Sequence, residues 1–362
     1  MKSNKKVLFF GPLPPPTTGQ SVVFEESLFV FSGDKVVVNN TFFGDNKLGN
    51  TFYSIFVLIY SFFRYNFDTV YFTCSRSLLG FGKDFILLLL SRLYKKRVIN
   101  HLHGASFKHF YNNSGCLKPI IKWSYNIVET SIVLLPEMAD QFSDFPCMKI
   151  LILSNPYPRQ LDLIDVDLSK KKKQILFLSN IIYSKGIFTF LDASLQLLSS
   201  DKNVSIRIAG VPMSDEFMSK VDVKLKFDKY YGDLKVKFGD RIKYLGGVLG
   251  DIKNELFNES SIFILPTFYT SEALPISIIE SMRLGNAIIT TEHNYLPHIV
   301  QKQMGFIVKK NSSSAIAERV IELFNNHALL HSMQLYNIQK AIDDYSPANY
   351  ERGLNLLFKR RA

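Results

Sequence analysis

Short apolar runs alternate with amphipathic stretches along most of the chain. Each run has the length of a buried β-strand, and each stretch between two runs shows the apolar spacing of a helix. Such alternation is typical of parallel βαβ units and predicts an α/β protein with two Rossmann-like, doubly wound domains that face each other across a cleft. The runs occupy residues 6–11, 68–73, 97–104, 131–136, 174–179, 204–210, 242–247, 261–266 and 286–291.

The alternation pauses once, between residues 160 and 174. The apolar residues there follow neither the strand nor the helix spacing strongly, and several lysines follow one another. A chain of 362 residues exceeds what one hydrophobic core usually supports, so we interpret this pause as a charged linker between two domains. We expect an N-terminal domain over residues 1–168 and a C-terminal domain over residues 169–346. A last helical pattern begins with a proline and occupies residues 347–362.

The composition adds a strong positive charge, with 43 Lys and Arg against 32 Asp and Glu and a net charge of +11. Such an excess attracts nucleic acid, anionic lipid or diphosphate ligands. Nucleic acid is disfavoured because the basic residues are spread along the chain and no recognition motif is present. The other two classes of anion remain.

The longest uncharged apolar stretch, residues 48–63, is shorter than the roughly 20 residues that span a bilayer. We therefore favour a packed amphipathic helix over membrane insertion. Residues 91–97, SRLYKKR, fit either a helix end that rests on an anionic membrane or a solvated helix end.

Three widely spaced cysteines suit a reducing compartment and suggest neither a disulfide framework nor a zinc site. The first apolar run is too short for a signal peptide, and we expect none. We therefore expect a cytoplasmic protein.

Ligands of open parallel sheets bind outside the carboxyl ends of the strands, and polar candidates follow four of the predicted strands. After the first strand, GPLPPPTTGQS places Gly19 where a helix begins. We expect the N–H groups of Gly19, Gln20 and Ser21 to be free for an anion. A rigid strand-to-helix turn is the alternative.

The second candidate is the segment NHLHG, which contains His101 and His103 separated by Leu102. We expect the two imidazoles on opposite faces of the strand, which argues against a shared metal ion. His103, beside Gly104, is the one expected to face the cleft, with an ordinary structural histidine as the alternative.

The third candidate is Lys185, which precedes Gly186 on a loop that enters a helix. A lysine there can neutralise a diphosphate while the glycine lets the backbone approach closely. An exposed loop lysine is the alternative.

The fourth candidate is the segment SEALPISIIESMRLG, residues 271–285. Glu272 precedes a predicted helix that Gly285 ends, Glu280 lies about a turn and a half inside it, and the N–H groups around residues 274–277 can bind phosphate. The two acids could then accept hydrogen bonds from a sugar and from a ribose. Alternatively, Glu272 merely complements the helix dipole and Glu280 lies on the surface.

Taken in order, these segments resemble the GT-B retaining glycosyltransferases of family 4 over essentially the whole chain. The resemblance implies that the C-terminal domain binds a UDP- or GDP-sugar donor and the N-terminal domain the acceptor, with the last helix crossing back to the N-terminal domain. It rests on the proline-rich loop with Gly19, HLHG (101–104), FLSNIIYSKG (177–186), LGGVLGDIKNELF (245–257) and EALPISIIE (272–280).

The same resemblance assigns roles to single residues and implies no metal ion or other cofactor. Where many family members carry an arginine, this chain has Asn180, so one charged contact with the diphosphate is lost or supplied elsewhere. The implied catalytic residues are His103 at the reaction centre, Lys185 on the donor diphosphate and Glu272 on the donor sugar; the implied donor-binding residues also include Gly19 opposite the diphosphate, Asn180 in the diphosphate loop, Val248 at the nucleobase, Leu274 near the phosphates and Glu280 at the ribose.

The sequence thus predicts an enzyme that transfers a sugar with retention to a glycan or a polyprenyl-diphosphate-linked acceptor. The expected setting is bacterial O-antigen, capsule or lipopolysaccharide synthesis, in peripheral contact with the anionic inner face of the cytoplasmic membrane. Two alternatives stay open: a nucleotide-sugar epimerase of the same fold, and a non-catalytic subunit that binds nucleotide sugar or glycan.

Overall fold

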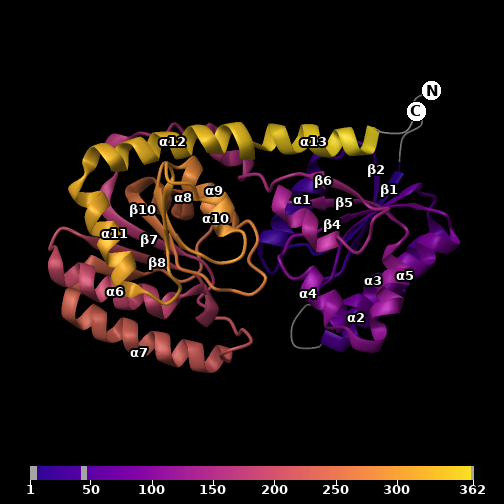
Figure 1. Ribbon diagram of the computed structural model, residues 1–362, viewed down its shortest axis with the longest axis horizontal. Helices are drawn as coiled ribbons and strands as arrows, with labels where there is room; N and C mark the ends of the chain where they lie inside the picture. Colours follow the sequence, from indigo (N-terminus) through magenta and orange to yellow (C-terminus); the bar gives the residue numbers. More distant parts are fainter. Residues whose placement is uncertain (1–5, 42–46, 360–362) are drawn as a thin grey trace. The chain divides into compact units, whose positions relative to one another are not determined.

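The computed structural model describes residues 6–41 and 47–359, and the chain divides into two compact units (Figure 1). Unit 1 comprises residues 1–155 and 348–362, and unit 2 comprises residues 156–347. Each unit is built on a parallel six-stranded sheet with helices between the strands, which confirms the predicted α/β class.

Unit 1 has the strand order β2-β1-β3-β4-β5-β6. The connections diverge from β1 to β2 on one side and β3 on the other, so a topological switch point lies between β1 and β3. The strands are β1 (Lys6–Gly11), β2 (Asp34–Asn39), β3 (Thr69–Thr73), β4 (Arg97–His101), β5 (Val128–Val133) and β6 (Lys149–Ile152). The helices are α1 (Gly19–Val30), α2 (Lys47–Arg64), α3 (Leu78–Leu93), α4 (Phe107–Asn112), α5 (Lys118–Tyr125) and, from the end of the chain, α13 (Pro347–Lys359).

Unit 2 has the strand order β12-β11-β10-β7-β8-β9, with its switch point between β7 and β10. The central strands β10 and β11 are buried along their whole length, as expected where helices cover both faces of a parallel sheet. The strands are β7 (Lys172–Leu178), β8 (Ser205–Ala209), β9 (Ile242–Tyr244), β10 (Ser260–Leu265), β11 (Ala287–Thr291) and β12 (Gly305–Val308). The helices are α6 (Ile187–Ser200), α7 (Lys220–Phe238), α8 (Gly250–Glu259), α9 (Ile276–Arg283), α10 (Leu296–Ile299), α11 (Ser313–Asn325) and α12 (His327–Tyr345).

The segment expected to be a charged linker is packed onto unit 2. The side-chain nitrogen of Lys171 donates hydrogen bonds to the carbonyl oxygens of Phe257, at 2.8 Å, and Leu284, at 2.5 Å. Arg283 donates to the carbonyl of Ile164 at 3.0 Å. Because these contacts tie the segment to α8 and α9, unit 1 ends at residue 155 rather than at residue 168.

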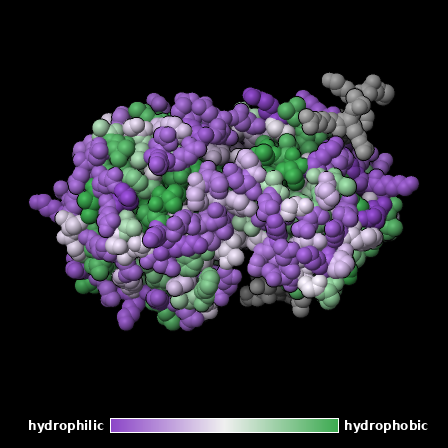
Figure 2. Space-filling model, viewed as in Figure 1, coloured by the Kyte–Doolittle hydropathy of each residue, from purple (hydrophilic) through white to green (hydrophobic). Residues whose placement is uncertain are grey.

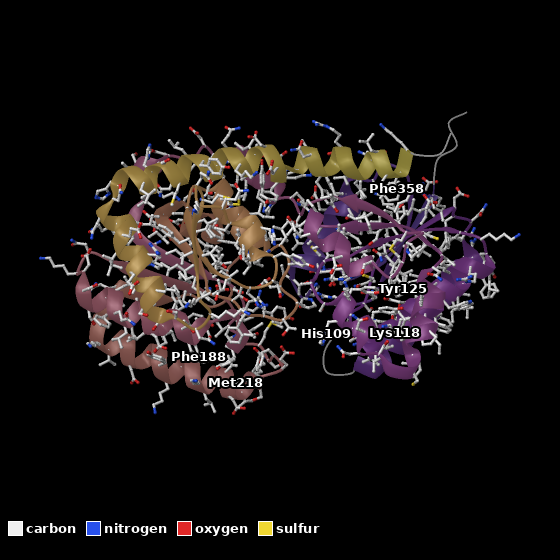
Figure 3. All side chains as sticks on the ribbon, viewed as in Figure 1. His109, Lys118, Tyr125, Phe188, Met218 and Phe358 are labelled. Carbon is white, nitrogen blue, oxygen red and sulfur yellow. The ribbon has the colours of Figure 1, made fainter. Side chains whose placement is uncertain are left out.

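The last helix, α13, completes unit 1. The hydroxyl of Tyr350 lies 2.6 Å from that of Ser27 on α1, which also contacts the hydroxyl of Tyr71 on β3 at 3.1 Å. Near the other end of α13, the ring of Phe358 packs against Phe31, with centroids 4.7 Å apart (Figure 3). Residues 360–362 of the expected final segment lie outside the described residues.

The apolar stretch at residues 48–63 forms most of α2. No helix in the described ranges combines the length and the apolar character needed to cross a bilayer. As expected, α2 packs on unit 1 through one side, but the side that it exposes is aromatic rather than polar.

Tyr350→Phe should destabilise unit 1, because it removes a hydroxyl from a fully buried cluster. We expect the free energy of unfolding to fall by about 1–2 kcal/mol. The sole tryptophan, Trp123, lies in unit 1, so its fluorescence during urea unfolding follows that unit. The control is Tyr336→Phe in unit 2, which should leave the urea midpoint reported by Trp123 unchanged. If both variants shifted this midpoint equally, the role given to Tyr350 would be wrong.

Lys171 should make the stability of unit 2 depend on pH. Burial lowers the pKa of its amine from 10.5 to about 7. Between these two values the unfolded chain binds the proton and the folded chain does not, so stability rises with pH across this window. The melting temperature of the wild type, measured by circular dichroism, should therefore rise relative to that of Lys171→Met between about pH 7 and pH 10. A constant difference would show that the amine is not buried.

Candidate functional site

The switch point of unit 2 brings together the loops that follow β7 and β10. After β7, a 3₁₀ turn, η5 (Tyr183–Lys185), ends at Lys185, and Gly186 follows with a φ of 77°. A Cβ at Gly186 would lie 2.1 Å from the carbonyl oxygen of Pro266. Glycine therefore lets the first loop pack directly on the second.

This packing pairs two residues that the sequence singled out. The ammonium of Lys185 lies 2.5 Å from Oε2 of Glu272, and both side chains are largely buried, with 15% and 8% of their surface exposed. The hydroxyl of Thr267 donates to the same oxygen at 3.1 Å. Oε1 of Glu272 accepts no hydrogen bond from the described residues, so the carboxylate keeps one oxygen for a ligand.

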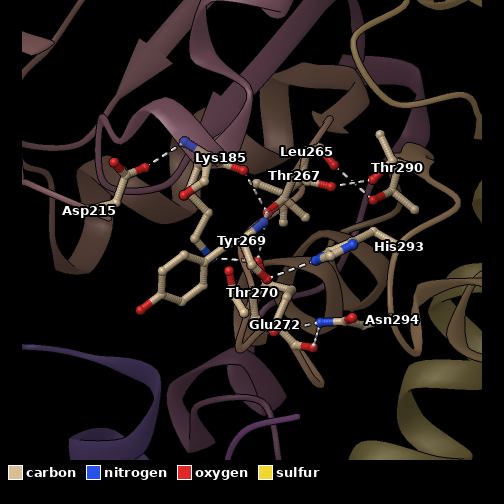
Figure 4. Close-up of polar contacts among 12 residues, drawn as sticks. Lys185, Asp215, Leu265, Thr267, Tyr269, Thr270, Glu272, Thr290, His293 and Asn294 are labelled. Carbon is tan, nitrogen blue, oxygen red and sulfur yellow. Dashed lines mark hydrogen bonds and ion pairs between the residues drawn. The ribbon is translucent and has the colours of Figure 1, made fainter. Parts of the chain in front are cut away.

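Side chains at the end of β11 and just after it hold the end of β10 and the loop that follows it in place (Figure 4). Each of them bonds a backbone carbonyl, so the loop's conformation does not depend on a ligand. The bonds run from Thr290 to Leu265 at 2.7 Å, from Thr291 to Thr267, from His293 to Tyr269 at 2.9 Å, and from Asn294 to Thr270 at 2.9 Å and to Glu272 at 3.0 Å. The sequence analysis missed these residues, although a polar cluster directly after a predicted strand was a usable signal.

Asp215 anchors the loop after β7 and was also missed. Its carboxylate accepts the N–H of Ser184 at 2.8 Å (Figure 4). It also accepts the N–H groups of Phe217 and Met218 at 2.9 and 2.8 Å. Although burial opposes it, this hydrogen bonding lowers the pKa of Asp215. A charged carboxylate thus fixes the turn that presents Lys185.

The start of α9 lies a few residues beyond Glu272. Pro275 is the N-cap of α9. The N–H groups of Ile276 and Ser277 donate no hydrogen bond within the described part of the chain, which leaves them available to an anion. Leu274, expected near the phosphates, is buried just ahead of them. Gly285, with a φ of 69°, follows the C-cap of the helix as predicted.

Glu280 is not a surface carboxylate. Only 3% of the residue is exposed, and Oε1 lies 2.5 Å from the ammonium of Lys253 on α8. Burial raises the pKa of Glu280, and the charge of Lys253 opposes that rise. The second carboxylate oxygen accepts no hydrogen bond from the described residues. The sequence analysis missed Lys253, which lies 27 positions away.

The two remaining donor-binding candidates lie on different loops of unit 2. Asn180 follows β7, at a point where Gly210 packs so closely that a Cβ there would lie 1.8 Å from the carbonyl oxygen of Ser179. Val248 lines a pocket of about 430 Å³ together with Tyr231 and Tyr244. A larger pocket of about 690 Å³ near the start of β7 contains none of the predicted site residues.

In unit 1, Gly19 is the first residue of α1, as expected, but the amides around it are only partly free. Thr18 caps the helix, and its hydroxyl accepts the N–H of Ser21 at 3.1 Å. The expectation that Ser21 offers a free N–H was therefore wrong, because the side chain of the N-cap takes it.

His101 and His103 lie side by side rather than on opposite faces. Their ring centroids are 3.9 Å apart, because residues two apart in an extended chain point to the same side. His101 is fully buried, with Nδ1 2.6 Å from the hydroxyl of Tyr71. Burial, followed by the charge of Arg76, lowers the pKa of His103 to about 3. His103 is therefore neutral at physiological pH.

Arg76 is a cation that the sequence analysis missed. It follows β3, at the switch point of unit 1, and its guanidinium lies so close to Gly104 that a Cβ there would be 1.3 Å from Nη1. Among the described residues it forms no ion pair or hydrogen bond. Asp84 accepts the N–H of the preceding Ser75 at 2.7 Å and so fixes the turn that carries Arg76. Within its described residues, unit 1 thus presents a cation without an ionic partner beside a neutral imidazole.

Within residues 6–41 and 47–359, no cluster of three or more His, Cys, Asp or Glu side chains is arranged to hold a metal ion.

Lys253→Met should destabilise unit 2, because it leaves the buried Glu280 carboxylate without its counter-charge. We expect a loss of about 3 kcal/mol at neutral pH and a smaller loss at acid pH, where Glu280 is protonated. Adding Glu280→Gln should restore much of the stability, which denaturant unfolding followed by circular dichroism would measure. Additive losses in the double variant would contradict direct pairing.

Comparison with known proteins places this geometry in a family. The family described as glycosyl transferases group 1 matches residues 160–340, which is half of the chain and includes both loops at the switch point of unit 2. The Salmonella typhimurium protein WcaL, whose name assigns it to colanic acid biosynthesis as a glycosyltransferase, is 20% identical over 193 residues. That match covers 51% of this chain and 45% of WcaL, so it spans less than half of the relative.

Two solved structures have the same fold over nearly the whole chain. HepE from Anabaena, solved with UDP and also with UDP-glucose, aligns with a TM-score of 0.73 at 12% identity and covers 98% of this chain and 100% of its own. Sucrose-phosphate synthase from Thermosynechococcus elongatus aligns with a TM-score of 0.71 at 13% identity and covers 98% of both chains. These structural similarities show the GT-B fold. Because the family matches half of its residues, this chain belongs to the glycosyl transferases group 1 family.

Proposed function

We propose that the protein is a retaining glycosyltransferase of family 4. It transfers a hexose from a UDP- or GDP-sugar to a glycan or a polyprenyl-diphosphate-linked acceptor during bacterial surface-polysaccharide synthesis. The observation that carries this proposal is the pair of Lys185 and Glu272 at the switch point of unit 2, close in sequence to the unpaired N–H groups that begin α9. The family match, the name of WcaL and the UDP and UDP-glucose in the HepE structures support it.

On this proposal, the donor diphosphate binds between Lys185 and the start of α9. Lys185 uses one hydrogen for Glu272 and keeps two for phosphate oxygens. The N–H groups of Ile276 and Ser277 supply further donors and the positive end of the helix dipole. These groups stabilise the negative charge that develops when the bond between the sugar and the diphosphate breaks, and the proposed reaction needs no metal ion or other cofactor.

Glu272 and Glu280 bind hydroxyl groups on this proposal. Each has one carboxylate oxygen paired with a lysine and another oxygen that accepts no hydrogen bond from the described residues. Glu272 takes a hydroxyl of the donor sugar, and Glu280 takes the ribose. Because Lys185 already neutralises Glu272, we assign it as a hydrogen-bond acceptor rather than a nucleophile.

Retention then follows from a front-face reaction. The acceptor oxygen bonds to the sugar carbon on the face that the diphosphate leaves, and a departing phosphate oxygen takes the acceptor's proton. Asn180, a neutral residue in the diphosphate loop, leaves Lys185 as the cation of that loop in this account. Val248 borders the nucleobase, and its position on the wall of a pocket is compatible with that role.

The acceptor binds to unit 1 on this proposal. Arg76 lies at the switch point of that unit, has no ionic partner among the residues that the structure describes, and suits an anionic group such as the diphosphate of a lipid-linked acceptor. His103, neutral because burial and Arg76 lower its pKa, can donate or accept one hydrogen bond without adding charge. Gly19 and Gln20 contribute backbone N–H groups at the start of α1.

The test begins by identifying the donor, because a nucleotide sugar that binds only the folded protein raises the melting temperature. With that donor, Lys185→Met should lower the turnover rate of transfer about 100-fold, since it removes the cation that meets the leaving diphosphate. Glu272→Gln should also lower turnover, while UDP still binds. The anomeric configuration of the product, read by NMR, tests retention.

Lys340→Met is the matched control, because it breaks the pair with Asp344 on α12 and should leave turnover unchanged. Turnover in Lys185→Met equal to that of the wild type would contradict the proposed site. Binding of a nucleotide sugar without transfer or hydrolysis in the wild type would instead support a non-catalytic subunit.

A further inference from the structure

Helix α2 presents its aromatic side to the solvent and its small polar side to the core. The inward side carries Thr51, Ser54 and Ser61 beside Leu58 and Phe62, and each of these residues is less than 10% exposed. The outward side, which we call the α2 stripe, has residues between 36% and 73% exposed. The stripe consists of Phe52, Tyr53, Phe56, Ile59, Tyr60 and Phe63. This arrangement is the reverse of a helix that only covers a soluble core.

The inward polar groups of α2 are satisfied locally. The hydroxyl of Ser54 donates to the carbonyl of Thr51 at 2.9 Å, and that of Ser61 donates to the carbonyl of Val57 at 2.7 Å. The core therefore accepts these hydroxyls at little cost. The exposed aromatic side is then a stable feature of the fold, and contiguous apolar surface of this kind marks an interaction site.

The stripe continues onto the neighbouring end of α3. The ring of Phe63 lies edge-on to Tyr94, with centroids 6.2 Å apart, and Leu93 beside it is 67% exposed. Basic residues stand at the same end of α2: Arg64 and Lys6 both lie within 6 Å of the ring of Tyr65. Figure 2 shows hydrophobic atoms at the surface of unit 1 in the area where Figure 1 labels α2.

Basic residues dominate the segment that carries the stripe. Residues 47–128 contain eleven Lys or Arg and two Asp, of which Asp84 is fully buried. Lys83 is buried, and Arg97 and Lys108 pair with Glu129 and Asp140, so the relevant bases next to the stripe are Arg64, Lys6 and Lys95. An aromatic helix face within such a basic segment matches the aromatic and basic residues found at membrane interfaces. Two copies of the chain that met here would bring like charges together.

We propose that α2 docks unit 1 on an anionic lipid bilayer. The helix lies along the interface with the α2 stripe among the acyl chains nearest the headgroups, and Arg64, Lys95 and Lys6 contact anionic headgroups. The inference goes beyond the proposed transfer reaction and does not depend on it, because it concerns a surface outside the switch points of both sheets.

Vesicle flotation of the full chain tests the proposal. The wild type should float with vesicles of phosphatidylcholine that contain about 30% phosphatidylglycerol at low salt, and much less with pure phosphatidylcholine. The triple variant Phe52→Ser, Phe56→Ser, Phe63→Ser should bind the anionic vesicles at least about tenfold more weakly, because it removes three rings from the lipid contact. All three side chains are at least 67% exposed, so the fold should tolerate the change, which Trp123 fluorescence during unfolding would check.

The matched control is the triple variant Val221→Ser, Leu225→Ser, Val236→Ser on α7, where the side chains are between 64% and 90% exposed. This control should float like the wild type. The pair Arg64→Gln and Lys95→Asn, where asparagine accepts the φ of 50° at position 95, should weaken binding to anionic vesicles while leaving the stripe intact. This pair keeps the test valid if the α2 triple variant does not fold.

Three results would overturn the proposal. The first is a wild type that does not float with anionic vesicles at low salt. The second is an α2 triple variant that folds and floats like the wild type. The third is a wild type that sediments as a dimer, ignores vesicles and becomes monomeric in the α2 triple variant, which would assign the stripe to a second copy of the chain. None of these results bears on donor binding, so this inference and the transfer proposal fail separately.

Discussion

Gly186 lets the loop after β7 lie against the carbonyl oxygen of Pro266, and the pairing of Lys185 with Glu272 depends on that contact. A side chain at position 186 would push the two loops apart and separate the charges. Asp215 accepts the N–H of Ser184 and so fixes the loop after β7. Asn294, which follows β11, donates to the carbonyl of Glu272 and so fixes the loop after β10. The ion pair is therefore held by backbone contacts on both sides rather than by the charges alone, which matters because desolvation offsets much of the attraction between buried charges.

The cations at the two switch points differ in whether a carboxylate pairs with them. In unit 2, Lys185 has a carboxylate partner, so its net charge is cancelled until another anion arrives. In the described part of unit 1, Arg76 has no such partner, and burial together with the charge of Arg76 lowers the pKa of His103. Asp84, whose pKa burial raises to about 6, serves the turn before Arg76 rather than the guanidinium. Each unit thus places a cation at the carboxyl end of its sheet, where parallel sheets bind ligands.

Much of the fold could be predicted because central strands of a parallel sheet are apolar along their whole length. The three missed strands, β2, β6 and β12, all lie at sheet edges. β2 and β6 are partly exposed, and β6 and β12 are four residues long, so the apolar run in each is interrupted or short. The domain boundary was misplaced for a related reason: a run of lysines suggests solvent, but the aliphatic stem and the hydrogen-bonding head of Lys171 fit between α8 and α9.

The candidate site could be predicted where position after a strand was enough, as for Lys185 and Glu272. It could not be predicted where a partner came from elsewhere in the fold. Lys253 reaches Glu280 from a different helix, and no local pattern announces that contact. The histidines are a different case, because the alternation of side chains in an extended chain already places His101 and His103 together, and applying that rule correctly would have predicted it.

Helix α9 is only eight residues long, yet two lysines hold it: Lys253 pairs with Glu280 near its middle, and Lys171 donates to the carbonyl of Leu284 at its C-cap. The entropy of ordering the helix is therefore lost when the chain folds and not when an anion arrives. On the proposed assignment, the start of α9 that binds the phosphates is separate from the loop residues around the sugar. Evolution could then exchange one sugar for another through a few loop substitutions, without rebuilding the part of the site that every nucleotide donor shares.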